Sequence, residues 1–263
     1  MGIGDHLETW GGWQAAVQAL AWQAELGAVD PIGDGPLNRY DLVVEAPRKV
    51  AVVEAAPVFS AGPVDAVAVA AQMAGGADTL EALRAAMAGY DLCDLKRGAR
   101  NLVFADGNPA ARVLVLGEAP GVNEDRAGLP FVGAAGKLLD RMFAAIGLDR
   151  TSPDPARALY ITNVLPWRPP ENRDPSAEEI AMFRPFVLRH IALADPDVIV
   201  TMGNTPLRCL FDTQGVTKLR GIWREVLGKP VLPMTHPAYL LRAPEAKREA
   251  WADLLALQHR LRG

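Results

Sequence analysis

Apolar residues recur at steps of three and four near the start of the chain, within the segment ETWGGWQAAVQALAWQAEL (residues 8–26). This spacing predicts an amphipathic helix that ends near Gly27, with an apolar face made of Trp10, Trp13, Val17, Leu20 and Ala24. From residue 28 to 76 the chain is rich in Ala, Pro, Gly and Val and has no clean period. We interpret this stretch as an extended or disordered linker, in which Val50 to Val53 could pair briefly as a strand.

Beyond residue 76, apolar runs of strand length alternate with longer amphipathic segments. Residues 78–88 predict a helix with Asp78 as its N-cap. The apolar runs predict strands at Val113–Leu116, Leu159–Val164, Val198–Met202 and Val231–Met234. The segments between and after them predict helices at Ala134–Ile146, Ala177–Leu193, Thr205–Phe211 and Ala246–Leu261.

This alternation indicates a parallel sheet with helices on both faces. We therefore predict an α/β fold, a three-layer α/β/α sandwich around a four-stranded, mostly parallel sheet. Two parts are expected: residues 1–75, a helix followed by a linker, and residues 76–263, which hold the α/β domain.

Composition narrows the class of protein. Half of the 263 residues are hydrophobic and 22% are charged, which excludes a collagen-like, coiled-coil or wholly disordered chain. No apolar run reaches the roughly 18 residues of a spanning helix, and no basic region precedes an apolar one at the N-terminus, so we expect no membrane span, no signal peptide and a cytoplasmic location. The two cysteines, Cys93 and Cys209, have no CxxC spacing, so the pattern predicts neither a disulfide nor a metal site.

Charge is distributed unevenly along the chain, although its total is only −4. Residues 1–75 carry nine acidic and three basic side chains, whereas the other 188 residues carry 22 acidic and 24 basic ones. A DNA-binding surface on the second part is therefore compatible with the composition, with modest affinity and a shallow salt dependence. For the acidic first part we expect an inert extension; a partner-docking or autoinhibitory role is the alternative.

Polar side chains follow three of the predicted strands where each strand ends. The stretch 117–125 follows the first strand, Asn163 ends the second, and the stretch 235–242 follows the last. Because ligands of open parallel sheets bind beyond the carboxyl ends of the strands, we expect a cleft with carboxylates, an amide and an imidazole. Such a cleft can bind a heterocycle and perform acid–base chemistry. The glycine-rich stretch is neither GxGxxG nor a Walker loop, so nucleotide cofactors have little support.

Each candidate residue also has a purely structural interpretation. Glu118 or Glu124 could satisfy backbone donors at a helix N-terminus, and Asn163 could form an Asx turn. His236 could be a loop histidine before a proline, and Phe131 could be an ordinary core residue. The strand-end pattern leaves both interpretations open.

Three segments taken together resemble the family 4 uracil-DNA glycosylases, in the same order and with compatible spacing: GEAPGVNEDRAGLPFVGAAGKLLDRM (117–142), ITNVLPWRPPENRDP (161–175) and THPAYLLR (235–242). The likeness extends over about residues 90–257 through FADGNPAARVLVLGEAPG (104–121), DPDVIVTMG (195–203) and VTKLRG (216–221). The resemblance implies the fold of that family. It also implies a monofunctional enzyme that flips uracil out of DNA and hydrolyses the N-glycosidic bond, which initiates base-excision repair.

The resemblance implies how the base is bound. Phe131 would stack on the extruded uracil, Asn163 would bind its N3 and O4 edge, and His236 would stabilise the charge that grows at O2. An Asn amide suits uracil because it donates to O4 and accepts from N3–H, a pattern that cytosine inverts. Thymine would be rejected by exclusion of its 5-methyl group, for which the sequence identifies no side chain.

The resemblance also implies roles for the loops around the base. Glu124 would be a second carboxylate near the sugar. The water-activating loop would consist of Gly117, Glu118, Ala119 and Gly121. The minor-groove wedge would consist of Tyr239, Leu240 and Leu241, and Arg242 would lie near a phosphate.

One departure from the family concerns its [4Fe–4S] cluster, which four cysteines commonly hold. This chain has only Cys93 at those positions; the other three are Tyr90, Trp167 and Phe183. One thiol cannot hold such a cluster, so we predict no iron–sulfur cluster, no other metal and no cofactor. We expect the three aromatic side chains to fill the vacated volume as a hydrophobic plug.

Further departures concern mechanism. Ala119 stands where related families have a water-activating aspartate, so water must be positioned by Glu118, Glu124 or backbone carbonyls. The three segments place no lysine where a nucleophile would act, so we expect no Schiff base and no strand cleavage. Residues 168–175 hold no histidine-containing insertion, so covalent trapping of the sugar is not expected.

Two competing functions stay open at this point. The first is a non-catalytic DNA- or damage-binding relative of the same fold, against which the retained candidate residues argue. The second is a small-molecule nucleoside hydrolase, against which the candidate wedge argues. The expected partners are uracil-containing DNA and a protein partner for the N-terminal helix, with no membrane.

Overall fold

The computed structural model of the chain describes residues 65–262 together with Val17 and Ala21. At its centre lies a sheet with the strand order β1-β3-β2-β4-β6-β5. Its four inner strands are parallel: β3 (Leu159–Asn163), β2 (Val113–Gly117), β4 (Val198–Met202) and β6 (Lys229–Met234). Its two edge strands pair antiparallel: β1 (Ala105–Gly107) and β5 (Arg224–Val226).

The predicted α/β class and its four parallel strands are confirmed. Every residue of β2, β3 and β4 is buried, which explains why uninterrupted apolar runs marked these strands in the sequence. The sheet has six strands rather than the predicted four, because the two edge strands, β1 and β5, were not predicted from the sequence. Each edge strand has three residues and none of them is buried, so neither carries an apolar run.

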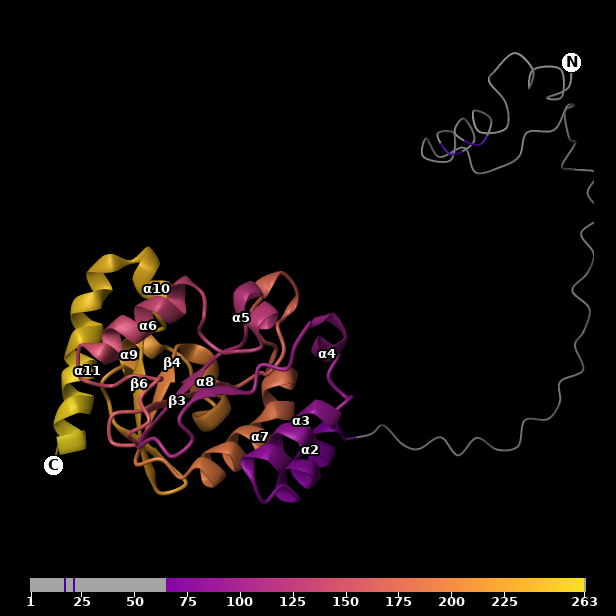
Figure 1. Cartoon of the computed structure of the whole chain (residues 1–263), viewed down its shortest axis with the longest axis horizontal. Coiled ribbons are helices and arrows are strands. Elements are labelled where there is room, and N and C mark those ends of the chain that lie inside the picture. Colours follow the sequence, from indigo (N-terminus) through magenta and orange to yellow (C-terminus); the bar gives the residue numbers. More distant parts are fainter. Residues whose placement is uncertain (1–16, 18–20, 22–64, 263) are drawn as a thin grey trace, which may run out of the picture. The chain divides into compact units, whose positions relative to one another are not determined.

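Helices cover both faces of the sheet (Figure 1). Along β2, Leu114 and Leu116 point to one face and Val113 and Val115 to the other, as the two-residue period of a strand requires. The first face packs against α7 (Ala177–Ala194) and α8 (Asn204–Phe211), and α2 (Ala66–Gly75) and α3 (Leu80–Gly89) pack in turn against α7. The second packs against α6 (Ala134–Ala144) and α11 (Lys247–Arg262).

Short helices complete the layers and follow the strand ends. They are α4 (Leu95–Gly98), α5 (Val122–Ala127), α9 (Val216–Leu219) and α10 (Pro237–Arg242), with single 3₁₀ turns at Pro170–Asn172 and Pro244–Ala246. None of the helices within the described part of the chain is long and apolar enough to cross a membrane.

The linker prediction is wrong for residues 66–75, which form α2. Asp65 caps this helix, because its carboxylate accepts from Val67 N and Ala68 N. The buried side of the helix contains Ala70 and Ala74 and faces α7. The stretch looked aperiodic because small alanines, rather than large apolar residues, form its buried face.

Two further predictions concern the N-terminal region. The next helix, α3, is capped by Thr79 and not by Asp78, because the Thr79 hydroxyl accepts from Ala82 N. In the predicted helix over 8–26, only Val17 and Ala21 are described, and both are helical and exposed. The rest of that helix and the linker over 28–64 lie outside the described residues, so they stay predictions, as does a domain boundary at residue 75.

Candidate active site

Gly117, Phe131 and Asn163 meet at the carboxyl ends of β2 and β3. Gly117 and Asn163 are direct neighbours in the parallel register of these strands. A Cβ atom on Gly117 would lie 2.3 Å from Asn163 Oδ1 and 2.4 Å from Phe131 Cε2. Only glycine leaves room for both side chains here, and the ring and the amide therefore converge on one point.

The Asn163 side chain is buried, with 5% of its surface exposed, and its Oδ1 has no hydrogen-bond partner among residues 65–262. A buried acceptor left unsatisfied costs about 1–3 kcal/mol, and native proteins keep few of them. The structural alternative, an Asx turn, requires this oxygen to accept from a nearby backbone N–H, which it does not. Asn163 Oδ1 is therefore free to accept from a ligand.

Phe131 adopts a left-handed backbone conformation, with φ of 53°. This region is unfavourable for a residue with a bulky side chain, and such strain, of order 1–3 kcal/mol, collects at functional sites. Its ring centroid lies 5.5 Å from that of His236, at an interplanar angle of 30°. Phe131 packs on core residues as well, but its backbone is not that of an ordinary core phenylalanine.

His236 is the N-cap of α10, where its Nδ1 accepts from Ala238 N at 3.1 Å. In a neutral imidazole the proton therefore resides on Nε2, which is left as a donor. Burial lowers the pKa of His236 to about 4; the positive charge of Arg242 acts in the same direction and the carboxylate of Glu124 opposes it. At neutral pH the ring is an uncharged hydrogen-bond donor.

Glu118 extends from the loop after β2 toward α8, where its Oε2 accepts from Thr205 Oγ1 at 2.7 Å. Burial raises the pKa of Glu118, and the hydroxyl of Thr205 partly offsets the shift. The backbone of this loop continues the pairing with β3, because Leu165 N donates to Glu118 O at 3.0 Å. Next to it, Ala119 packs against the core and brings no polar group.

The carboxylate of Glu124 is occupied by backbone donors. Its Oε2 accepts from Gly121 N at 3.2 Å, and its Oε1 accepts from Val132 N at 3.0 Å and from Gly133 N at 2.7 Å. These bonds tie the first turn of α5 to the loop that carries Phe131. Glu124 therefore has the structural role considered for it, a carboxylate that accepts from backbone donors at a helix N-terminus. Its carboxylate also fixes the loop that carries Phe131.

The expected wedge is only partly exposed. Tyr239 and Leu241 are 41% and 42% exposed, and Arg242 is exposed beside them. Leu240 is fully buried against Leu138 and Ala250. The prediction that Leu240 contacts DNA is wrong because the α10 turn directs this side chain inward, toward α6 and α11.

The residues at the cysteine positions of the family pack together in the core. Phe183 lies edge-on to Tyr90 and to Trp167, with ring centroids 5.8 and 5.5 Å apart, and these three side chains and Cys93 are at most 3% exposed. The predicted packing of the three aromatic side chains is confirmed.

The same residues do not fit the [4Fe–4S] cluster that the family implies. Three of the four positions carry aromatic rings, which supply no thiolate, and burial raises the pKa of the remaining Cys93 thiol. In the described part of the chain no three His, Cys, Asp or Glu side chains are grouped so that they could hold a metal ion.

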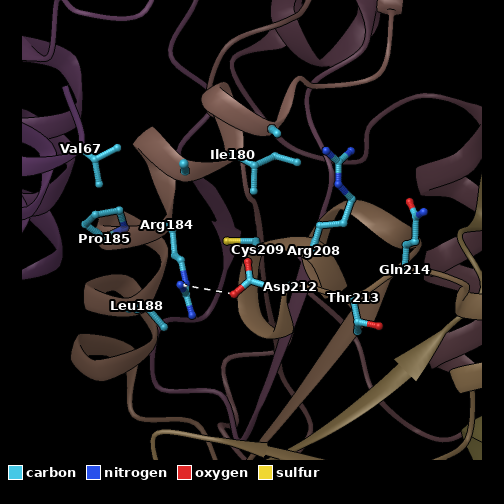
Figure 2. Close-up of a pocket in the computed structure, with 12 residues that line it drawn as sticks. Val67, Ile180, Arg184, Pro185, Leu188, Arg208, Cys209, Asp212, Thr213 and Gln214 are labelled. Carbon is cyan, nitrogen blue, oxygen red and sulfur yellow. Dashed lines mark ion pairs between the residues drawn. The ribbon is translucent and has the colours of Figure 1, made fainter. Parts of the chain in front are cut away.

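A separate groove of about 840 Å³ lies between α7 and α8 (Figure 2). Arg184 and Asp212 face each other across it, with 3.8 Å between Nη1 and Oδ2, and Cys209 lies at its floor. None of the predicted site residues lines this groove. The convergent polar groups lie at the strand ends instead.

Sequence reasoning missed two residues that hold the site. Thr205 follows the carboxyl end of β4, so the same strand-end rule that found the other candidates could have found it. Arg150 donates to the backbone carbonyls of Pro130 and Phe131, at 3.0 and 3.1 Å. No local signal marks Arg150, because its partners are about 20 residues away in the sequence.

Comparison with known proteins agrees with this geometry. The pattern of the uracil DNA glycosylase superfamily matches residues 104–255. The chain is 38% identical to the type-4 uracil-DNA glycosylase of Sulfurisphaera tokodaii over 184 residues, which are 65% of this chain and 80% of the relative. It is 42% identical to that of Thermotoga maritima over 153 residues, 57% of this chain and 77% of the relative.

A third relative extends the same result. The type-4 uracil-DNA glycosylase of Archaeoglobus fulgidus is 39% identical over 170 residues, which are 61% of this chain and 82% of the relative. Identity at this level over most of each relative, together with the superfamily match, shows that the chain belongs to the uracil-DNA glycosylase superfamily and, within it, to the type-4 uracil-DNA glycosylases.

Proposed function

We propose that this protein flips uracil out of DNA and hydrolyses its N-glycosidic bond as a monofunctional glycosylase, with the residues at the strand ends in the roles given below. Uracil-DNA glycosylase activity in DNA repair is the function of its family. The observation that carries the finer proposal is the buried, unsatisfied Oδ1 of Asn163 beside the ring of Phe131.

Recognition depends on the amide of Asn163. Its Oδ1 accepts from uracil N3–H, which satisfies the oxygen that lacks a partner in the free protein, and its Nδ2 donates to O4. Cytosine presents the opposite pattern and would leave the buried amide unpaired. The ring of Phe131 stacks on the base, and Gly117 lets the amide and the ring approach each other.

Departure of the base is assisted by His236. Negative charge grows on the uracil O2 as the N-glycosidic bond breaks, and the Nε2–H of the neutral imidazole donates to that oxygen. The bond from Ala238 N to Nδ1 fixes this tautomer before the reaction, so the donor needs little reorganisation. The bond electrons leave with the base, and water then adds to the cationic sugar.

Water positioning falls to Glu118. Burial raises the pKa of its carboxyl group, which makes the ionised form a stronger proton acceptor than an ordinary carboxylate, and Thr205 fixes one of its oxygens. Ala119 offers no side chain for this purpose. For Glu124, the three backbone bonds support a positioning role; its place near the sugar rests on the resemblance alone.

Access to the base requires the DNA to be opened. Tyr239 and Leu241 are exposed apolar groups on α10 that can enter a base step, and Arg242 beside them can contact phosphate. We also propose that the enzyme works without a metal or cofactor. Isolated from an iron-replete culture, it should be colourless and contain no iron.

Two proposals rest on the sequence alone. The cytoplasm is the proposed location of the enzyme. The amphipathic helix predicted over residues 8–26 is proposed as an element for a protein partner, with an inert extension as the alternative.

Cleavage of a uracil-containing oligonucleotide, followed by alkali treatment, tests the function. Wild-type protein should produce alkali-labile sites, Asn163→Ala and His236→Ala should lose this activity, and His259→Ala, a change at an exposed histidine of α11, should retain it. Binding of the oligonucleotide without cleavage by the wild type would favour a non-catalytic relative. Hydrolysis of free deoxyuridine would favour a nucleoside hydrolase.

A further inference from the structure

Two oppositely charged side chains hold the backbone of the loop that carries Phe131. Arg150 donates from Nη1 to Pro130 O and from Nη2 to Phe131 O. Glu124 accepts from Val132 N and Gly133 N. Four consecutive residues, 130–133, are thereby fixed by one guanidinium and one carboxylate.

Arg150 is itself anchored. Its side chain is 10% exposed and lies between two carboxylates, with 3.0 Å from Nη1 to Asp106 Oδ2 and 2.7 Å from Nη2 to Asp140 Oδ1. Asp106 belongs to the edge strand β1 and Asp140 to α6. The guanidinium therefore links the sheet edge and a helix to the loop, and its planar set of donors allows it to bind both carboxylates and both carbonyls.

The two carbonyls are placed where Phe131 needs support. The left-handed φ of Phe131 turns its carbonyl oxygen toward α6, where a Cβ atom on Gly136 would lie only 1.7 Å from that oxygen. Gly136 provides the space and Arg150 provides the donor. Bonds to the carbonyls on both sides of the Phe131 Cα restrain its φ and ψ, and these angles set the direction of the Cα–Cβ bond that carries the ring.

We propose that Arg150 is a positioning residue for base stacking, which fixes the ring of Phe131 over the uracil through the Pro130 and Phe131 carbonyls. The proposal rests on the stacking role assigned to Phe131 above. Arg150 acts through the backbone of Phe131, and no contact between Arg150 and substrate is required.

Arg150→Lys is the informative substitution. Lysine keeps the charge that Asp106 and Asp140 require, so the folded protein should keep a Tm within about 4 °C of the wild type. An ammonium group has no planar fork and cannot hold both carbonyls in the same geometry. The single-turnover rate on a uracil-containing oligonucleotide should therefore fall on the order of tenfold to a hundredfold, as expected when a reacting group is misplaced.

Arg157→Lys is the matched control. Arg157 is an exposed arginine seven positions further along the chain, and its side chain makes no hydrogen bond within residues 65–262. This variant should keep the wild-type rate. A loss of rate in Arg157→Lys equal to that in Arg150→Lys would overturn the proposal, because the effect would then not depend on the bonds from Arg150 to the Pro130 and Phe131 carbonyls.

A double-mutant cycle separates positioning from a general structural effect. In a Phe131→Ala background there is no ring to position, so adding Arg150→Lys should change the rate by less than about twofold. The proposal fails if Arg150→Lys keeps the wild-type rate, or if it lowers the rate equally with and without the ring.

The same measurements distinguish a failure of the proposed function from a failure of the proposed role of Arg150. Inactive wild-type protein would contradict the proposed function itself. A wild-type rate in Phe131→Ala would contradict the stacking role and, with it, the role of Arg150.

Discussion

Two regions share the segment from Asn163 to Trp167, one containing Asn163 and the other Trp167, and they are built differently. The proposed uracil pocket, formed by Gly117, Phe131, Asn163 and His236, has an amide oxygen without a partner among residues 65–262, a left-handed phenylalanine and a half-buried histidine with a lowered pKa. The aromatic plug, formed by Tyr90, Trp167 and Phe183, has edge-to-face rings and a tyrosine hydroxyl that donates to Ala66 O at 2.8 Å.

The difference shows which parts of the enzyme are chemically replaceable. The plug stands where the family commonly holds a metal cluster, and it fills that position with ordinary apolar packing, which many side chains can supply. The pocket needs particular atoms at particular places, because uracil is read by one donor and one acceptor. Stability can be reached by several routes, whereas recognition of the base depends on one arrangement.

The largest expected effect on activity comes from Asn163→Ala. We expect a rate loss on the order of 10³-fold or more, because the pocket then lacks both hydrogen bonds to the base. The free energy of unfolding should stay the same or rise slightly, because the unsatisfied oxygen is removed. Single-turnover cleavage and urea unfolding of the same preparation measure the two effects. A large loss of stability would mean that Asn163, like the plug residues, stabilises the fold, and the two regions would then not differ in this respect.

The reverse result is expected for Phe183→Ala. Phe183 is fully buried and touches both other rings of the plug, so its removal should lower the free energy of unfolding by about 3–5 kcal/mol. The rate per folded molecule should stay close to that of the wild type at a temperature where the variant is folded. Urea unfolding together with active-site titration would check this, and Phe183→Leu should show a smaller loss of stability.

How much of the molecule could be predicted from the sequence depended on whether the signal was local. The inner strands and long helices were predictable because long apolar runs and helical periods are local signals. Asn163, Phe131 and His236 were predictable because they follow strand ends or lie in segments that resemble a known family.

Residues whose roles depend on distant contacts were not predictable. Arg150 reaches carbonyls 19 and 20 residues away, and Leu240 turned out to be buried because α10 packs against elements remote in sequence. The helix α2 was missed because alanine gives a weak apolar signal, although small side chains suit close packing against α7. In each instance the deciding partner lies in another part of the fold.

Acid should weaken the folded state through two histidines with lowered pKa values, one in the pocket and one in the core. Burial lowers the pKa of His236 to about 4 and that of His190, which is bonded to the Tyr160 hydroxyl, to about 3. Between about pH 6.5 and pH 4 the unfolded chain binds protons at these positions that the folded chain does not, so stability falls as the pH falls. We expect a loss on the order of a few kcal/mol over this range, measured by urea unfolding at each pH.

Variants separate the two histidines. His236→Asn should flatten part of this pH dependence, whereas His259→Asn, at an exposed position, should leave it unchanged. An equally steep dependence in His236→Asn would mean that the pKa of His236 is not lowered in the folded protein, and the dependence would then be assigned to the core histidine His190.

The smallest predicted effect concerns the tyrosine hydroxyl of the plug. Tyr90→Phe removes the hydrogen bond to Ala66 O at the start of α2 and leaves the ring packing intact, so the free energy of unfolding should fall by about 0.5–1.5 kcal/mol. Activity should not change, because the ring pairs and the hydrogen bond of Tyr90 involve Phe183, Phe186 and Ala66, and none of these belongs to the pocket. Tyr239→Phe, at an exposed position on α10, is the control for stability and should leave it unaltered. A loss of activity in Tyr90→Phe without a loss of stability would mean that the plug and the pocket are coupled, and the two regions could no longer be treated as independent.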